Sequence, residues 1–261
     1  YERNVRKSKI LIVPHAGYKY SAQVAASAYG ELLKYADSFS NVVIVGPAHY
    51  VSINGVAVPR YDYFKTPLGK IAVNQDKVKD LLNNNLFSYN DNAFAKEHSI
   101  EVQLPFLQKV LHKFKIIPLV YGNVEPKKLA EGLRDFLYDE DTLLVFSADL
   151  SHYFKADKAE KIDAHTARMI DLGNAGLDKE MSCGAEGINA ALLLAKEMQM
   201  KGYTYQDETK RHQLISEQLN CKKDTIKPTL TFPIPFIANN PPTKAKRAYC
   251  IFPKAPFTGP I

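Results

Sequence analysis

Three histidines in this sequence share one setting, because each closely follows a short apolar run of the kind that forms a buried strand. They are His15, His49 and His152, and the runs before them end at Val13, Gly46 and Ser147. In open α/β sheets, ligands bind in the crevice beyond the carboxyl ends of the strands. Neutral imidazole is a ligand for zinc, iron and copper, and it also carries protons in catalysis. The repeated pattern therefore predicts a metal site or an acid–base site at this edge of a sheet.

A carboxylate and a thiol have positions that suit the same site. Asp149 lies between the third run and His152, and Cys183 comes directly before Gly184 and a helix that we predict for residues 185–198. The N-terminus of a helix favours the thiolate, which is the form of cysteine that binds metal. Each residue also has a plainer interpretation, since a lone histidine is most often a hydrogen-bonded structural group and a lone cysteine a small buried apolar one.

The elements that position these residues follow from the hydrophobic pattern. Apolar runs that are typical of strands alternate with stretches of helical periodicity. We expect strands at 9–13, 41–46, 54–59, 70–73, 115–121, 142–147 and 248–252, and helices at 126–138 and 155–172. Two more helices are predicted from their caps, one from Ser21 to about Asp37 and one from Asn74 to about Asn83. This alternation predicts an α/β fold, a three-layer α/β/α sandwich with a central, largely parallel or mixed sheet.

A further helix is predicted around residues 97–111, kinked or restarted at Pro105. On one continuous helix Glu97 and Glu101 would share a face, because they are four residues apart. Both carboxylates are therefore candidates for orienting the ligands of a metal, or for a plain solvated or helix-capping role.

Length and composition limit the classes of protein. The 261 residues suit a single α/β domain over 1–261, with an irregular, proline-rich and basic insertion at about 209–247. This insertion is a solvated surface segment, a lid or a partner-binding element. The net charge of +6 is spread along the chain, so we expect no nucleic-acid partner. We expect no membrane span, because no apolar run approaches ~20 residues. The N-terminal residues carry no signal-peptide core, and three cysteines are too few for a disulfide framework, so we expect a cytoplasmic protein.

Five motifs follow one another along the chain: Pro14-His15-Ala16-Gly17-Tyr18, Gly46-Pro47-Ala48-His49, Glu97-His98-Ser99-Ile100-Glu101 with Leu104-Pro105, Ser147-Ala148-Asp149 with His152, and Cys183-Gly184. In sequence and in order they resemble the motifs of the MEMO family, which includes the proteins called AmmeMemoRadiSam system protein B. The fold of this family is similar to that of class III, LigB-type extradiol dioxygenases. The resemblance thus implies the same α/β architecture as the hydrophobic pattern.

The resemblance also implies a metal site formed by His15, His49 and Cys183. His98, Asp149 and His152 would then line the same cleft as catalytic residues. In the related dioxygenases the metal is Fe(II), held by two histidines and a glutamate. A thiolate in place of that carboxylate makes the site softer, which favours iron, copper or zinc over magnesium or calcium. By resemblance to the dioxygenases, Fe(II) is the leading expectation, with copper or zinc as alternatives. The expected activity is a metal-dependent, dioxygenase-like oxidoreductase acting on an unknown small molecule.

Two other functions remain open at this stage. In the first, the cleft belongs to a signalling adaptor that binds phosphotyrosine or acidic peptides without turnover, as members of the family are linked to such binding. Alternatively, Cys183 is a hydrolase nucleophile with His15 or His152 as its base, although no Gly-x-Ser-x-Gly elbow is present. For a prokaryotic protein the resemblance implies radical-SAM and AMMECR-type proteins as partners, and for a eukaryotic one an additional nuclear location. The chain departs from many relatives at Tyr50, where they have a second histidine, and in the 209–247 region.

Overall fold

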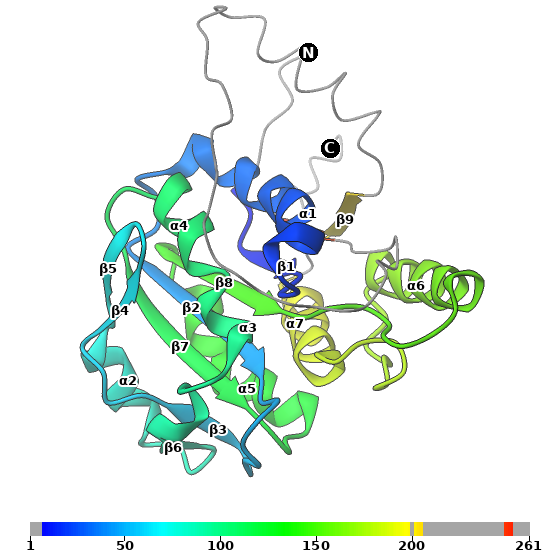
Figure 1. The fold of residues 1–261 in the computed structure, drawn as a ribbon. Coiled ribbons are helices and arrows are strands. Elements are labelled where there is room, and N and C mark those ends of the chain that lie inside the picture. The colour runs from blue at the N-terminus through cyan, green and yellow to red at the C-terminus, as the bar shows by residue number, and fades with distance from the viewer. Residues whose placement is uncertain (1–6, 199–200, 206–247, 253–261) are drawn as a thin grey trace, which may run out of the picture. The chain divides into compact units, whose positions relative to one another are not determined.

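The computed structural model describes residues 7–198, 201–205 and 248–252 (Figure 1). They belong to one compact unit. The insertion predicted at 209–247 lies outside the described residues, so the single domain over 1–261 stays a prediction. Among the described residues, no helix combines the length and the apolar character needed to cross a membrane.

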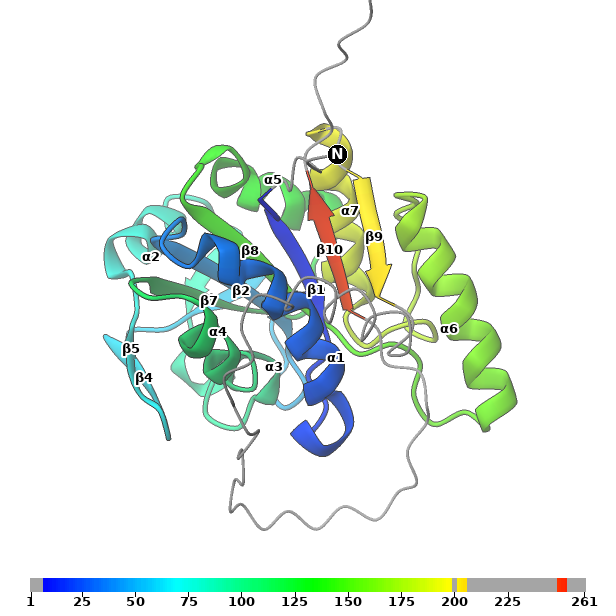
Figure 2. The ribbon, with the colours of Figure 1, turned by 90° about the horizontal axis from the view of Figure 1, so that it is seen from above.

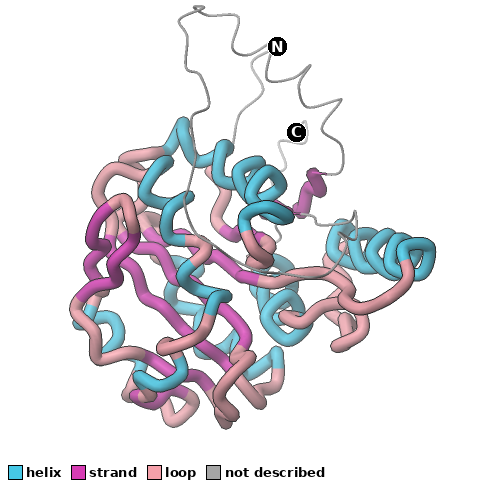
Figure 3. Tube along the Cα trace, viewed as in Figure 1, coloured by secondary structure: helices cyan, strands magenta, loops and turns pink. Residues whose placement is uncertain are grey.

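An eight-stranded sheet with the order β6-β3-β7-β2-β8-β1-β10-β9 forms the middle of the fold (Figure 3). Its four central strands are mutually parallel: β1 (Ile10–Val13), β2 (Asn41–Pro47), β7 (Lys115–Tyr121) and β8 (Thr142–Ser147). All of their residues are buried except Lys115, which is why they appear in the sequence as unbroken apolar runs. All four strands were predicted from the sequence.

The outer strands make the sheet mixed. On one side β3 (Val56–Val58) is antiparallel to β7 and parallel to β6 (Phe87–Tyr89). On the other side β10 (Ala248–Phe252) is antiparallel both to β1 and to β9 (Lys201–Tyr205). A separate hairpin joins β4 (Tyr63–Thr66) to β5 (Gly69–Ala72). The strands β4, β6 and β9 were not predicted, whereas the strand at 248–252 was.

Helices cover both faces of the sheet, which confirms the predicted α/β/α sandwich (Figure 2). On one face lie α1 (Tyr18–Gly30), α3 (His98–Glu101) and α4 (Leu104–Val110), and on the other lie α5 (Pro126–Tyr138) and α7 (Ala185–Glu197). The remaining helices are α2 (Gln75–Leu81), α6 (Ala156–Asp171) and the short 3-10 turns η1 (Glu31–Tyr35) and η2 (Asp91–Ala93). Asn74 caps α2 as predicted, since its side chain accepts a hydrogen bond from the backbone N–H of Lys77.

Two helix predictions are wrong in detail. The first helix begins at Tyr18 with Gly17 as its N-cap, and Ser21 lies inside it, where the hydroxyl donates to the carbonyl of Ala16 instead of capping. Serine serves either role, because its hydroxyl bonds nearby backbone groups in both settings. The helix predicted around 97–111 is two short helices, with Pro105 in the first turn of α4. Glu97 and Glu101 therefore do not share a face: Glu97 is the buried N-cap of α3, and Glu101 is exposed.

Candidate metal centre

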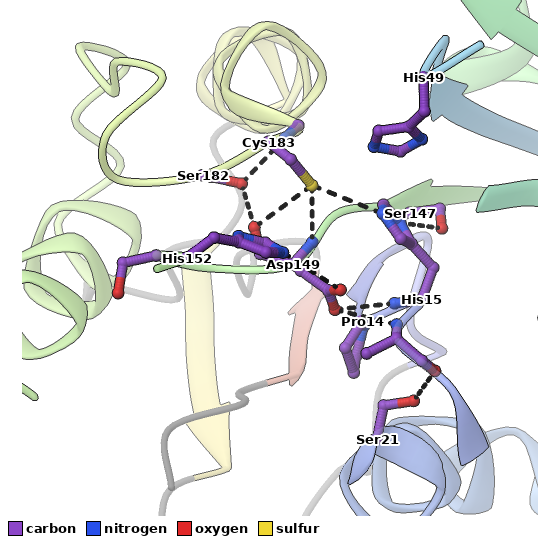
Figure 4. Close-up of polar contacts among 12 residues, drawn as sticks. Pro14, His15, Ser21, His49, Ser147, Asp149, His152, Ser182 and Cys183 are labelled. Atoms are coloured by element: carbon purple, nitrogen blue, oxygen red, sulfur yellow. Dashed lines mark hydrogen bonds and ion pairs between the residues drawn. The ribbon is translucent and has the colours of Figure 1, made fainter. Parts of the chain in front are cut away.

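The three residues expected to bind metal lie together at the carboxyl edge of the sheet. His15 follows β1, His49 follows β2 and Cys183 directly precedes α7, and one ligand atom of each lies within 4.8 Å of those of the other two (Figure 4). The sulfur of Cys183 is 3.5 Å from Nε2 of His15. The two imidazole rings meet edge to face, with their centroids 5.2 Å apart. His15 is buried and His49 is exposed, so the cluster is open to solvent on one side.

The parallel pairing of the central strands explains why residues so distant in sequence meet. The strand β8 lies between β1 and β2 and is parallel to both, with Val13 opposite Ser147. The chain segments that leave β1, β2 and β8 therefore emerge at the same edge, as the sequence pattern predicted. Helix α7 packs on the same three strands, and this contact brings Cys183 to that edge.

A carboxylate orients His49. Glu97 Oε1 lies 2.8 Å from Nδ1 of His49, and Glu97 Oε2 accepts the backbone N–H of the same residue at 2.7 Å. Burial alone would raise the pKa of Glu97, but the hydrogen bonds from His49 and from the backbone of Ser99 outweigh it and hold the pKa at about 2. Because the carboxylate is ionised, it accepts a hydrogen bond from Nδ1, so the neutral ring of His49 carries its proton on that nitrogen. The lone pair of Nε2 is then available to a metal. The same hydrogen bond raises the pKa of His49.

A glycine allows Glu97 to come this close. A Cβ atom at Gly46, in β2, would lie 2.4 Å from the hydroxyl oxygen of Ser99 in the first turn of α3. With glycine there, the hydroxyl of Ser99 donates to the carbonyl of Pro47, and the start of α3 lies directly on the end of β2. The close packing of α3 on β2 therefore explains why the Gly46-Pro47-Ala48-His49 motif begins with glycine.

A buried chain of hydrogen bonds orients His15. Its Nδ1 lies 3.0 Å from the hydroxyl of Ser147, and that hydroxyl also accepts a hydrogen bond from the amide of Gln103 at 2.9 Å. With Nδ1–H directed at Ser147, Nε2 is the nitrogen that faces Cys183. Burial lowers the pKa of His15 to about 4, so the ring is neutral at neutral pH. Neutral imidazole is the form that coordinates metal.

Backbone contacts position Cys183. Its sulfur accepts the backbone N–H of Asp149 at 3.4 Å, an interaction that stabilises a thiolate. The carbonyl of Asp149 in turn accepts the hydroxyl of Ser182 at 2.6 Å. A Cβ atom at Gly184, the N-cap of α7, would lie 2.4 Å from Cβ of Ala148. The absence of a side chain at Gly184 therefore lets the Cys183 turn pack directly on the end of β8.

The structure brings two of the three predicted catalytic residues to the cluster. One carboxylate oxygen of Asp149 accepts the backbone N–H groups of His15 and Ala16, at 3.0 and 3.2 Å, and the other lies 3.7 Å from Nε2 of His152. The side chain of His152 is 37% exposed. His98, by contrast, faces Glu101 at 2.8 Å and the ring of Tyr50, and it makes no hydrogen bond to the cluster within the described part of the chain.

The donor set suits a transition metal. Two imidazole nitrogens and one thiolate are the ligands that zinc, copper and iron accept, whereas magnesium and calcium prefer oxygen. Both Nδ1 atoms have hydrogen-bond partners, as is usual for histidines that bind metal through Nε2. Three protein ligands would leave coordination positions for water or substrate.

Sequence reasoning missed the roles of Ser147 and Gln103. Gln103 is fully buried and also bonds the carbonyl of Pro14 and the hydroxyl of Tyr29. The signal in the sequence was a glutamine directly beside Leu104 in an otherwise apolar segment. A long polar side chain there needs buried partners.

Comparison with known proteins identifies relatives of this chain. The sequence matches the family model described as Memo-like protein over residues 1–216. A MEMO1 family protein of Metallosphaera sedula is 36% identical over 218 residues, which cover 78% of this chain and 77% of that one. Another, of Sulfolobus acidocaldarius, is 34% identical over 218 residues, 78% of this chain and 76% of that one. A solved structure of an uncharacterized Escherichia coli K12 protein is a remote neighbour, with a TM-score of 0.48, 12% identity, and coverage of 72% of this chain and 88% of that one. The chain belongs to the Memo family.

Proposed function

We propose that this protein is a metal-dependent oxidoreductase in which His15, His49 and Cys183 hold one Fe(II) ion, with copper or zinc as the alternatives. The observation that carries the proposal is the convergence of three soft or borderline donors within 4.8 Å, at the edge of an α/β sheet where ligands bind. The orientation of both rings supports it, because each Nδ1 has a partner and each Nε2 is left for a ligand.

The chain supplies the groups that would handle protons and substrate. A bound iron or copper ion would supply redox chemistry with O₂. His152 is the proton carrier in this proposal, because it is half-exposed and its Nε2 faces Asp149 at 3.7 Å. Asp149 has a second task, since its carboxylate holds the backbone of His15 and Ala16. His98 lies further out, where it and the exposed ring of Tyr50 would contact substrate.

Elemental analysis of anaerobically purified protein tests the ligand assignment. We expect about one iron or copper ion per chain in the wild type and its loss in Cys183→Ala and in His49→Ala. Cys221→Ala and His112→Ala are the matched controls, one for each residue type, and both should keep the metal. If Cys183→Ala and His49→Ala both retain a stoichiometric ion, the assignment is wrong. Oxygen uptake with candidate substrates then tests the redox activity, and His152→Ala should abolish turnover while keeping the metal.

One contact favours a second candidate function. The 3.5 Å distance between the sulfur of Cys183 and Nε2 of His15 also fits a nucleophile and its base in a hydrolase. The two functions differ in the reactivity of the thiol, because coordination protects a thiolate. Slow alkylation of Cys183 by iodoacetamide in metal-loaded protein, and fast alkylation after chelation, would support the metal site. Fast alkylation at neutral pH in both states would support the hydrolase.

A further inference from the structure

A second candidate site lies at the end of the sheet opposite to the metal cluster, where β2 and β7 begin. A cavity of about 880 Å³ is formed by the hairpin strand β5, the end of α4 and the segments that enter β2 and β7. Figure 1 shows β5 at the rim of the fold, and this strand contacts β7. Asn41 begins β2 and His49 follows its end, so a strand length of about 20 Å separates the cavity from the cluster.

The cavity is strongly basic. Among the described residues, four lysines line it and no aspartate or glutamate does; the lysines are Lys70, Lys109, Lys113 and Lys115. None of the four forms an ion pair in the described part of the chain, and Lys70 lies instead over the ring of Tyr63, 3.9 Å from its centroid. Lysines that line one cavity without forming ion pairs repel one another and attract an anion.

Two carboxylates contact residues that line this cavity. Asp37 contacts Nδ1 of His112 at 2.9 Å, and Asp141 accepts the hydroxyl of Ser40. His112 and Ser40 both line the cavity. These two carboxylates keep their negative charges, so they offset part, but not all, of the positive charge of the four lysines.

The rest of the cavity lining suits a ligand that carries an organic part in addition to its phosphate groups. The amide of Asn74 donates to the side-chain oxygen of Asn41 at 2.7 Å, and the amide of Asn41 donates to Ser40 at 3.1 Å. The amide of Asn74 keeps one further N–H for a ligand, because an amide nitrogen carries two, whereas the amide of Asn41 also bonds the carboxylate of Asp141. Ile71, Leu111 and Phe114 provide apolar surface in the same cavity. The volume is within the range of small-molecule sites, which is about 300–1,000 Å³.

We propose that this cavity binds an organic phosphate of nucleotide size, with the lysines holding the phosphate groups and the apolar and amide lining holding the organic part. Basic groups give affinity for any phosphate, whereas the apolar and amide surface distinguishes an organic phosphate from an inorganic one. The site is independent of the proposed metal centre, because it shares no residue with it.

Calorimetric titration of the whole chain tests the proposal, with ADP, pyrophosphate and adenosine as probes. We expect ADP to bind more tightly than pyrophosphate, adenosine not to bind, and the affinity for ADP to fall as salt is raised. Lys109→Glu/Lys113→Glu should weaken ADP binding by about tenfold or more, through lost attraction and added repulsion. The control Lys127→Glu/Lys161→Glu changes the net charge equally, at exposed positions on α5 and α6, and should bind ADP like the wild type.

Four outcomes would overturn the proposal. They are no binding of ADP at millimolar concentration, equal loss in the two double variants, pyrophosphate binding as tightly as ADP, and loss of ADP binding in Cys183→Ala. Equally tight binding of pyrophosphate would assign the cavity to inorganic polyphosphate. Loss of ADP binding in Cys183→Ala would place the ligand at the metal centre. If Cys183→Ala still binds ADP, this supports a site separate from the metal centre, whether or not the variant retains its metal.

Discussion

Glu97 contacts His49 twice, once at Nδ1 of the ring at 2.8 Å and once at the backbone N–H at 2.7 Å. The carboxylate therefore sets both the position of the residue and the nitrogen that carries the proton. Because Glu97 is also the N-cap of α3, one buried side chain connects the start of this helix to the end of β2.

Glu97→Gln should weaken metal binding by about 10- to 100-fold, because an uncharged amide no longer holds the proton on Nδ1 of His49. Competition with a chelator, followed by metal analysis, measures the change. Glu101→Gln is the matched control: this carboxylate is exposed, faces His98, and its loss should leave metal affinity unchanged. Equal affinities of Glu97→Gln and the wild type would show that His49 is not a ligand through Nε2.

Gln103→Leu should lower the free energy of unfolding by about 2–4 kcal/mol, because it removes buried hydrogen bonds to Ser147, the Pro14 carbonyl and Tyr29. It should also weaken metal binding, since Ser147 is the partner of Nδ1 of His15. Urea unfolding and chelator competition measure the two effects. Gln23→Leu, at an exposed position of α1, should change stability by about 0.5 kcal/mol or less. A Gln103→Leu variant as stable as this control would contradict the assigned role of the network.

The sequence was sufficient for the parts of the fold that rest on unbroken local patterns. The apolar runs of β1, β2, β7 and β8 predicted buried parallel strands, and the residues that follow β1 and β2 predicted the two imidazoles of the cluster. The topology alone predicts that these two imidazoles lie close together, since the carboxyl ends of parallel strands share one edge of the sheet. Cys183 required the family resemblance, because its approach depends on how α7 packs on the sheet.

What the sequence could not provide depends on contacts between distant segments. Gln103 and Pro14 are 89 positions apart, and no local periodicity reveals their hydrogen bond. Ser21 has the chemistry of a cap, but with Gly17 as the N-cap the helix begins four residues earlier than a cap at Ser21 implies. The basic cavity likewise collects lysines from β5, α4 and the segment before β7, and in the sequence these residues resemble ordinary solvated surface.

The stability of the fold should depend on Lys9 at alkaline pH. Its ammonium donates to the carbonyls of Asp139 and Thr142, and burial together with nearby Lys7 lowers its pKa from 10.5 to about 8. Below pH 8 the folded and unfolded chains are both protonated here, and the charge destabilises the fold. Between pH 8 and 10.5 the unfolded chain binds more protons, so this contribution to stability rises with pH.

Urea unfolding of the wild type and Lys9→Met, at several pH values from about 7 to 10, isolates this effect. We expect the free energy of unfolding of the wild type to increase relative to that of the variant by about 1–3 kcal/mol over this range. Other alkaline groups, such as Tyr18 with a pKa raised by burial to about 12, titrate alike in both proteins and cancel in the difference. A difference that stays constant with pH would show that Lys9 has an ordinary pKa.

Gly184→Ala should disturb the metal centre without touching a ligand. The new Cβ would lie 2.4 Å from Cβ of Ala148, so the turn that carries Cys183 must move away from the end of β8. We expect a loss of about 1–3 kcal/mol in stability and a lower metal content, both measured on the same sample. Gly30→Ala is the matched control, because a Cβ at this last residue of α1 meets no atom within 4 Å and should stabilise the helix by about 0.5–1 kcal/mol. If Gly184→Ala keeps both its metal and its stability, the position of Cys183 does not depend on contact between this turn and Ala148.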